Sequence, residues 1–264
     1  MTDALQDAVH TQAEDGVLTI TLNRPKANAI NVPTSLALYA AFAKLQEDPD
    51  LRVAILTGTG RFFSAGWDLA GATEGEAIDA NHGPGGFGGL TEFFSLGKPV
   101  IAAVNGLAMG GGFELALAAD LMLASDSAEF ALPEVKLGMV ADSGGVLRLP
   151  HRLPRPLAME LMLTGRRMRA DEAFRWGLLN QVTPAAELMD AARALAQQIV
   201  HAAPLAVAAV KEIVSATEGQ DLQSAYQTLR SGTLPTYRNM LRSQDAAEGP
   251  LAFSEKRPPR WTGR

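Results

Sequence analysis

Two glutamates and a glycine triplet fall within one largely apolar stretch of the chain, between residues 98 and 138. The pattern predicts a buried strand at 99–104, a turn at Asn105-Gly106, and a helix that opens at Gly110-Gly111-Gly112. The first amides of a helix have no partner within it, and glycine has no Cβ to keep a ligand oxygen away from them. Such amides, at the positive end of a helix, suit a developing oxyanion.

The two glutamates add groups for proton transfer. Glu114 falls in the first turn of the predicted helix, and Glu134 follows Pro133 after a second apolar run. Burial raises the pKa of a carboxyl, and two carboxyls close together titrate as a coupled pair, so one can act as acid and the other as base near neutral pH. Taken singly, Glu114 would favour the helix dipole and Glu134 would cap a turn or pair with Lys136. Their joint occurrence in apolar segments favours a catalytic pair.

A phosphate-binding loop is the rival interpretation of the glycine triplet. The GxxxxGK[ST] pattern is absent from the sequence. A carboxylate two residues after the last glycine would also repel a phosphate. The pattern therefore favours an oxyanion site over a phosphate site.

A second glycine-containing turn, at residues 62–69, follows a predicted buried strand at 53–57 and could supply another backbone donor. At these two turns the chain resembles the enoyl-CoA hydratase/isomerase (crotonase) superfamily, in which two backbone amides hold a thioester oxygen. The resemblance covers almost the whole length. It is carried by NRPKANAI, FSAGWDLAG, KPVIAAVNG, GGGFELALAAD, FALPEVKLGMVADSGGVLRLP, LTGRRMRADEAFRWGLLNQV and PLAFSEKR.

The resemblance implies a role for each matching position. It assigns the oxyanion amides to Trp67 and Gly111, and the acid/base pair to Glu114 and Glu134, which is the arrangement of hydratases and dehydratases. It implies coenzyme A contacts at Lys26, Ala65, Asp68, Phe253 and Lys256, with Arg24 and Arg257 as weaker candidates. Coenzyme A would be part of the substrate, and neither a separate cofactor nor a metal is expected.

Within the superfamily, the likeness is strongest to members that interconvert L-carnitinyl-CoA and crotonobetainyl-CoA. It rests on PKANAI, FFSAGWDL, GPGGFGGLTEFF, GGGFELALAAD, TGRRM, RWGLLN and EGPLAFSEKR, with ADSGG where PDSGG is expected. Such a substrate carries a γ-trimethylammonium group, which an aromatic face attracts, so Trp67, or Phe87 and Phe94, could border it. Two alternatives stay open: a general short-chain enoyl-CoA hydratase of fatty-acid breakdown, and a non-catalytic binding protein of the same fold.

Composition agrees with a folded enzyme. The chain has 264 residues, 47% of them hydrophobic and 20% charged, enough for a full core. It has no cysteine, which excludes thiolate catalysis and disulfides, and its four scattered histidines show no metal spacing and are expected on surfaces or in loops. The net charge of −6 predicts no nucleic-acid footprint. No apolar run is long enough for a membrane span, and the acidic N-terminal segment lacks the features of a secretory signal, so a cytoplasmic location is expected.

The elements that must position these residues alternate between strand and helix. Strands are predicted at 17–22, 53–56, 100–104 and 180–183, and helices at 34–46, 111–119, 157–163, 170–176 and 185–202, with another from Pro204. Periodicity alone does not separate this pattern from a doubly wound sheet. The resemblance implies an α/β crotonase-like core of repeated ββα units over residues 1–200, with a C-terminal helical region over 201–264 that joins a homotrimer or a hexamer. The glycine-rich segment 71–89 is expected to be a mobile loop over the acyl site.

Overall fold

The computed structural model describes residues 8–73 and 75–264. The acidic N-terminal segment, for which the sequence predicts no secretory signal, therefore lies partly outside the described residues. Glu74, in the predicted loop 71–89, lies outside them as well. The main sheet has six strands in the order β1-β2-β4-β7-β9-β12, parallel except for the β1–β2 pair. These strands are Val9–Glu14, Val17–Leu22, Val53–Gly58, Val100–Val104, Leu121–Ser125 and Gln181–Thr183.

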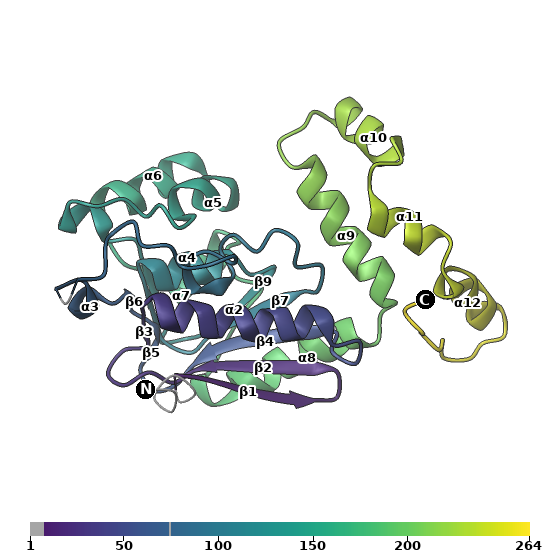
Figure 1. Ribbon diagram of the computed structural model, residues 1–264, viewed down its shortest axis with the longest axis horizontal. Helices are drawn as coiled ribbons and strands as arrows, with labels where there is room; N and C mark the ends of the chain where they lie inside the picture. The colour runs from purple at the N-terminus through teal and green to yellow at the C-terminus, as the bar shows by residue number, and fades with distance from the viewer. Residues whose placement is uncertain (1–7, 74) are drawn as a thin grey trace.

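The main sheet is covered on both faces (Figure 1). Alternate residues of β4 point to opposite sides. Val53 and Ile55 pack against α8 (Leu188–Val200) in a smaller cluster, whereas Ala54 and Leu56 join the large core on the other side. Burial of both faces explains why the parallel strands read as nearly continuous apolar runs.

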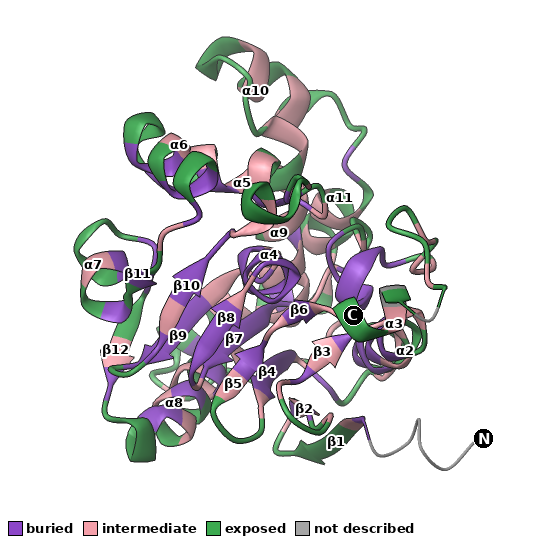
Figure 2. Cartoon of the chain, turned by 90° about the vertical axis from the view of Figure 1, so that its left-hand side faces the viewer, coloured by how far each residue is buried: buried purple, intermediate pink, exposed green. Residues whose placement is uncertain are grey.

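The second layer is a smaller sheet with the order β11-β10-β8-β5, accompanied by a separate β3–β6 pair. These strands have two or three residues each: Phe62–Ser64, Leu107–Met109, Glu129–Ala131 and Met168–Arg169 in the sheet, and Ala29–Ile30 and Gly66–Trp67 in the pair. They lie beside α4 (Gly111–Leu117), in which every residue is buried (Figure 2).

Helices complete the two layers. Those of the core are α2 (Val32–Glu47), α3 (Leu69–Thr73), η1 (Phe87–Gly89), η2 (Glu134–Leu137), α5 (Gly145–Arg152), α6 (Arg155–Thr164), α7 (Ala170–Arg175) and η3 (Ala185–Glu187). The C-terminal helices are α9 (Pro204–Thr217), α10 (Leu222–Arg230), α11 (Pro235–Leu241) and α12 (Gln244–Ser254), and they extend away from the core (Figure 1). Lys211 Nζ of α9 lies 2.7 Å from Asp120 Oδ2, which ties this arm to the core.

The fold confirms the predicted mixed α/β architecture with C-terminal helices. The division into domains at residue 200 stays a prediction; α8 ends at Val200 and α9 begins at Pro204. Within the described ranges, no single helix is long and apolar enough to cross a bilayer. The segments Ala185–Val200 and Pro204–Thr217 together meet both criteria, but they join at a bend of 101°.

Candidate active site

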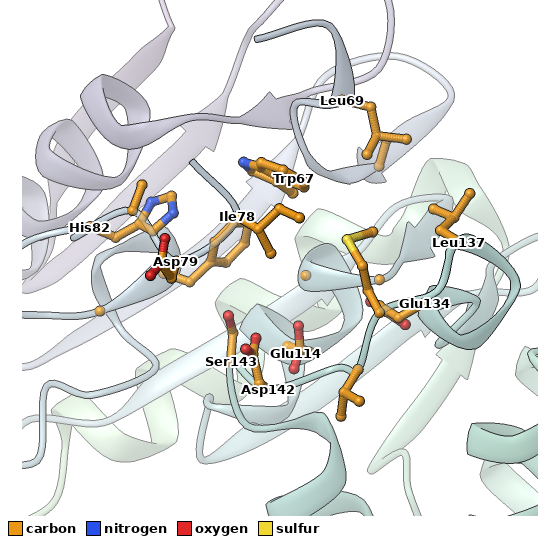
Figure 3. A pocket seen from close by; sticks show the side chains of 18 of the residues that line it. Trp67, Leu69, Ile78, Asp79, His82, Glu114, Glu134, Leu137, Asp142 and Ser143 are labelled. Atoms are coloured by element: carbon orange, nitrogen blue, oxygen red, sulfur yellow. The ribbon is translucent and has the colours of Figure 1, made fainter. Parts of the chain in front are cut away.

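A cavity of about 640 Å³ opens between the two glycine turns, the segment after α3 and the start of α5 (Figure 3). Five of the predicted site residues, which lie up to 69 positions apart in the sequence, line this cavity. They are Ala65, Trp67, Gly111, Glu114 and Glu134.

Glu114 is the most buried titratable group of the cavity, with a residue exposure of 3%. The backbone N–H of Gly145, at the start of α5, donates to its Oε1 at 2.8 Å. Burial raises the pKa of Glu114 to about 8; the Gly145 hydrogen bond opposes this, and the charges of Glu134 and Asp142 add to it. Glu114 therefore holds a proton at neutral pH.

Glu134 is the first residue of η2 and lines the same cavity. Burial also raises the pKa of this carboxyl, its own backbone amide opposes the rise, and Asp142 adds to it. Its Oε2 is buried and has no hydrogen-bond partner among the described residues. The alternative pairing with Lys136 is not seen among the described residues, where Lys136 Nζ donates to the carbonyl of Gly165 at 2.8 Å.

The two glycine turns meet beside these carboxyls. Gly66 has φ +83°, and a Cβ there would lie 2.7 Å from the amide nitrogen of Gly111, so the turn before Trp67 packs directly on the N-terminus of α4. A Cβ on Gly110 would lie 2.7 Å from Glu134 Oε1. Only glycine allows this close approach of backbone to backbone and to carboxylate, which accounts for the glycine triplet.

The Trp67 indole has a fixed orientation. Its Nε1–H donates to Glu76 Oε1 at 2.8 Å, and the other oxygen of Glu76 accepts from the backbone N–H of Val32 at 3.1 Å. Glu76 thus ties the ring to the N-terminal end of α2. Phe87 also lines the cavity and is buried, whereas Phe94 is 79% exposed and lies outside the lining.

The predicted coenzyme A contacts divide into two groups. Ala65 lines the cavity, and its N–H donates to Ala27 beside the exposed Lys26. Asp68 follows on the same strand edge. Burial alone would raise its pKa, but the Arg24 guanidinium, 2.6 Å away, and the amides of α3 hold the pKa below its usual value.

Phe253 and Lys256 are exposed on and just beyond α12, in the arm that extends away from the core. They do not line the cavity of their own chain, so their contact with coenzyme A stays a prediction that requires a neighbouring subunit. Arg257 is engaged by Glu248 and Glu255, each at 2.6 Å.

Several lining residues were missed by sequence reasoning. Asp142 and Ser143 belong to the ADSGG stretch, which was noted only for its alanine. Asp79 and His82 come from the glycine-rich segment, whose irregular sequence carries no periodic signal. Among the residues that the structure describes, the lining contains five acidic side chains and neither lysine nor arginine; the acidic residues are Asp79, Glu92, Glu114, Glu134 and Asp142. Within the described part of the chain, no group of three or more His, Asp or Glu side chains is placed to hold a metal ion.

The comparison with known protein families decides the relationship. The model of the enoyl-CoA hydratase/isomerase family matches residues 12–264. The chain belongs to the enoyl-CoA hydratase/isomerase family. A carnitinyl-CoA dehydratase of Escherichia coli K12 is 59% identical over 261 residues, which cover 98% of this chain and all of that protein.

Solved structures of the family agree in fold. An enoyl-CoA hydratase of Mycobacterium tuberculosis superimposes with a TM-score of 0.89 at 43% identity, covering 98% of this chain and 100% of that one. A carnitinyl-CoA hydratase of Mycobacterium avium gives a TM-score of 0.76 at 44% identity, covering 98% and 99%. The resemblance inferred from the motifs is confirmed over the full length of the fold.

Proposed function

We propose that this chain is a hydro-lyase that interconverts L-carnitinyl-CoA and crotonobetainyl-CoA. The observation that carries the chemistry is the pair Glu114 and Glu134, two carboxyls of raised pKa that line one cavity beside the glycine turns. The identity of the substrate is supported by the 59% identical carnitinyl-CoA dehydratase and by the acidic lining, which has no lysine or arginine among the described residues.

In the dehydration direction, the ionised carboxylate of the pair removes the proton from Cα of the thioester. The electrons move onto the carbonyl oxygen, and the N–H groups of Trp67 and Gly111 stabilise that enolate. The enolate collapses to the enoyl thioester, the Cβ–O bond breaks, and the protonated carboxyl gives its proton to the leaving hydroxyl, which departs as water. Each oxyanion donor is worth about 3 kcal/mol and each positioned acid or base roughly 10²- to 10⁴-fold in rate.

We assign the acid in this direction to Glu114. It is the carboxyl that is protonated at neutral pH, with its pKa raised to about 8 mainly by burial. Because Oε1 of Glu114 accepts the Gly145 N–H, the transferable proton belongs on Oε2. Glu134 then acts as the base toward Cα, and the roles reverse during hydration.

The substrate is tested by kcat/KM for crotonobetainyl-CoA against crotonyl-CoA, followed by loss of the enoyl-thioester absorbance. A strong preference for the cationic substrate is expected. An equal or reversed preference would instead support a general short-chain enoyl-CoA hydratase. Full hydration activity in both Glu114→Gln and Glu134→Gln would contradict the mechanism, and no turnover of any acyl-CoA would support a non-catalytic binding protein.

The Trp67 ring supplies a separate test of cation recognition. An aromatic face attracts a quaternary ammonium by about 0.5–2 kcal/mol, so Trp67→Ala should lower the preference for the cationic substrate by about twofold to thirtyfold. Trp67→Phe is the matched control, because it keeps an aromatic face and removes only the Nε1 hydrogen bond to Glu76. Unchanged discrimination in Trp67→Ala would remove the ring from the recognition of the ammonium group.

We further propose that residues 201–264 assemble the chain into a homotrimer or a dimer of trimers, located in the cytoplasm. Of α9 only Ala209 is buried, while Val210 and Val214 are 61% and 59% exposed. A neighbouring subunit that covers this apolar face would also bring its own Phe253 and Lys256 toward the cavity. Sedimentation equilibrium gives the mass of the particle, and a monomer would contradict the proposal.

A further inference from the structure

His82 has a more defined environment than the other three histidines. It lies in the irregular segment between α3 and η1, lines the cavity and is half-buried. Its ring makes an edge contact with Phe87, with the ring centroids 5.0 Å apart and an angle of 61°. Its Nδ1 lies 2.9 Å from the hydroxyl oxygen of Ser35 on α2.

A short chain of hydrogen bonds defines the proton positions on this ring. The backbone N–H of Gly88 donates to Ser35 Oγ at 3.0 Å, and Ser35 is fully buried. Within residues 8–73 and 75–264, the only group placed to accept the Ser35 hydroxyl proton is Nδ1 of His82. A buried hydroxyl donates where it can, so Nδ1 is the acceptor and the proton of the neutral ring sits on Nε2.

A second proton on His82 would disturb this chain. Nδ1 would become a donor, and the hydroxyl proton of the fully buried Ser35 would lose its acceptor. Burial lowers the pKa of His82 in the same direction, while the charge of Glu76 opposes the change. The arrangement keeps the imidazole uncharged at neutral pH.

An uncharged ring at this place matters for a cationic ligand. Figure 3 shows Trp67, Asp79 and His82 on the same side of the cavity, above Asp142 and Glu114. Within the described ranges, neither Asp79 nor Asp142 has a hydrogen-bond or ion-pair partner for its side chain. An aromatic face and unpaired carboxylates attract a quaternary ammonium, which cannot accept or donate a hydrogen bond, whereas an imidazolium beside them would repel it.

We propose that His82 is a specificity-determining residue, which the Gly88–Ser35 chain holds uncharged so that the cavity admits a cationic acyl group. The inference rests on the proposed function, because it takes the γ-trimethylammonium group as the ligand. The titratable groups that share this environment are Glu76 beside the ring, Asp79 and Glu92 in the lining, and Glu114 and Asp142 below. Since they respond to pH as well, the test must isolate His82.

The experiment measures kcat/KM for crotonobetainyl-CoA and for crotonyl-CoA between pH 5 and pH 8, with the purified full-length protein. The ratio of the two values removes the pH dependence that both substrates share. In the unsubstituted protein the ratio should fall as His82 gains its proton at low pH. A unit charge roughly 6 Å from the ammonium, at an effective dielectric constant near 40, corresponds to about tenfold.

Two substitutions isolate the imidazole. His82→Asn keeps an acceptor near the Nδ1 position and does not titrate. The ratio measured for this variant should therefore not show the fall of about tenfold at low pH that protonation of His82 causes in the unsubstituted protein. His82→Lys places a permanent charge there and should lower the ratio by about tenfold even at pH 8. His10→Asn, at an exposed position on β1 outside the cavity, is the matched control and should follow the unsubstituted protein.

The outcomes separate this inference from the proposed function. If crotonobetainyl-CoA is a substrate and His82→Asn shows the same change of ratio with pH as the unsubstituted protein, the inference about His82 is wrong and the function stands. If His82→Asn does not fold, an unchanged ratio in the unsubstituted protein between pH 5 and pH 8 refutes it equally. If crotonobetainyl-CoA is not turned over at any pH, the proposed function itself is wrong.

Discussion

The burial of Glu114 should cost stability at alkaline pH, and Glu114→Gln should recover it. The folded protein raises the pKa of this carboxyl from 4.5 to about 8, mainly by desolvation. The unfolded chain therefore releases the proton near pH 4.5, and the folded chain releases it only near pH 8. Between these values the unfolded state binds fewer protons, so the free energy of unfolding falls as pH rises.

The size of the effect follows from the same pKa. Each pH unit between the two values is worth about 1.4 kcal/mol, which gives an upper limit of ~5 kcal/mol above pH 8. Glutamine cannot ionise, and its Oε1 can still accept the Gly145 N–H, so the variant should lack this loss. Glu114→Gln is expected to be inactive but more stable than the unsubstituted protein above pH 7, with little difference near pH 4.5.

The assay is urea unfolding at pH steps from 5 to 9, at one fixed protein concentration because assembly also contributes to stability. Glu14→Gln, at an exposed position on β1, controls for the general effect of replacing a glutamate by glutamine. If the free energies of Glu114→Gln and the unsubstituted protein stay parallel from pH 5 to pH 9, the carboxyl is not held protonated by burial. Its role as the resting acid would then be refuted.

Two further substitutions test the supports of the site. Gly145→Ala places a Cβ 3.1 Å from Glu114 Oε1 and closer still to two apolar side chains, so it should lower kcat by tenfold or more and cost about 1–3 kcal/mol of stability through overpacking. Gly97→Ala is the control and should show neither effect, because the nearest atom to its Cβ is 3.8 Å away. Equal effects of the two substitutions would refute the reasoning. Lys211→Met removes the ion pair with Asp120 and should cost about 1 kcal/mol, measured by urea unfolding, and less at high salt; a cost that does not change with salt would point to lost packing instead.

The parts of the fold that could be predicted are those whose own sequence dictates them. The strands Val17–Leu22 and Val100–Val104 have the predicted bounds, because both are apolar runs closed by turn residues. The edge strand β1 was missed, since five of its six residues are exposed and VHTQAE shows no apolar alternation. The short strands of the second layer were also missed, because strands of two or three residues exist only through pairing with distant segments.

Helix α5 was missed for a local reason. Its sequence GVLRLPHR has Pro150 inside the helix and no side-chain hydrogen bond at its N-cap, so its start carries no usual signal and its interior carries a helix-breaking one. This helix supplies the N–H that binds Glu114. The sequence thus revealed the two carboxyls through their apolar surroundings, but it could not reveal the backbone group that orients one of them.

The cavity's acidic character links its electrostatics to the proposed substrate. Catalysis needs one ionised and one protonated carboxyl, yet burial and the charge of Asp142 oppose ionisation of either glutamate. A γ-trimethylammonium group is bonded to the carbon next to Cβ, so binding the substrate brings a cation to within a few ångströms of the glutamate that handles the β-hydroxyl. That cation stabilises the carboxylate of Glu114, which is the base during hydration and is formed by proton transfer during dehydration, and it offsets the repulsion within the lining. A neutral acyl group of the same length supplies no such charge, and the cavity should therefore discriminate through kcat as well as through binding.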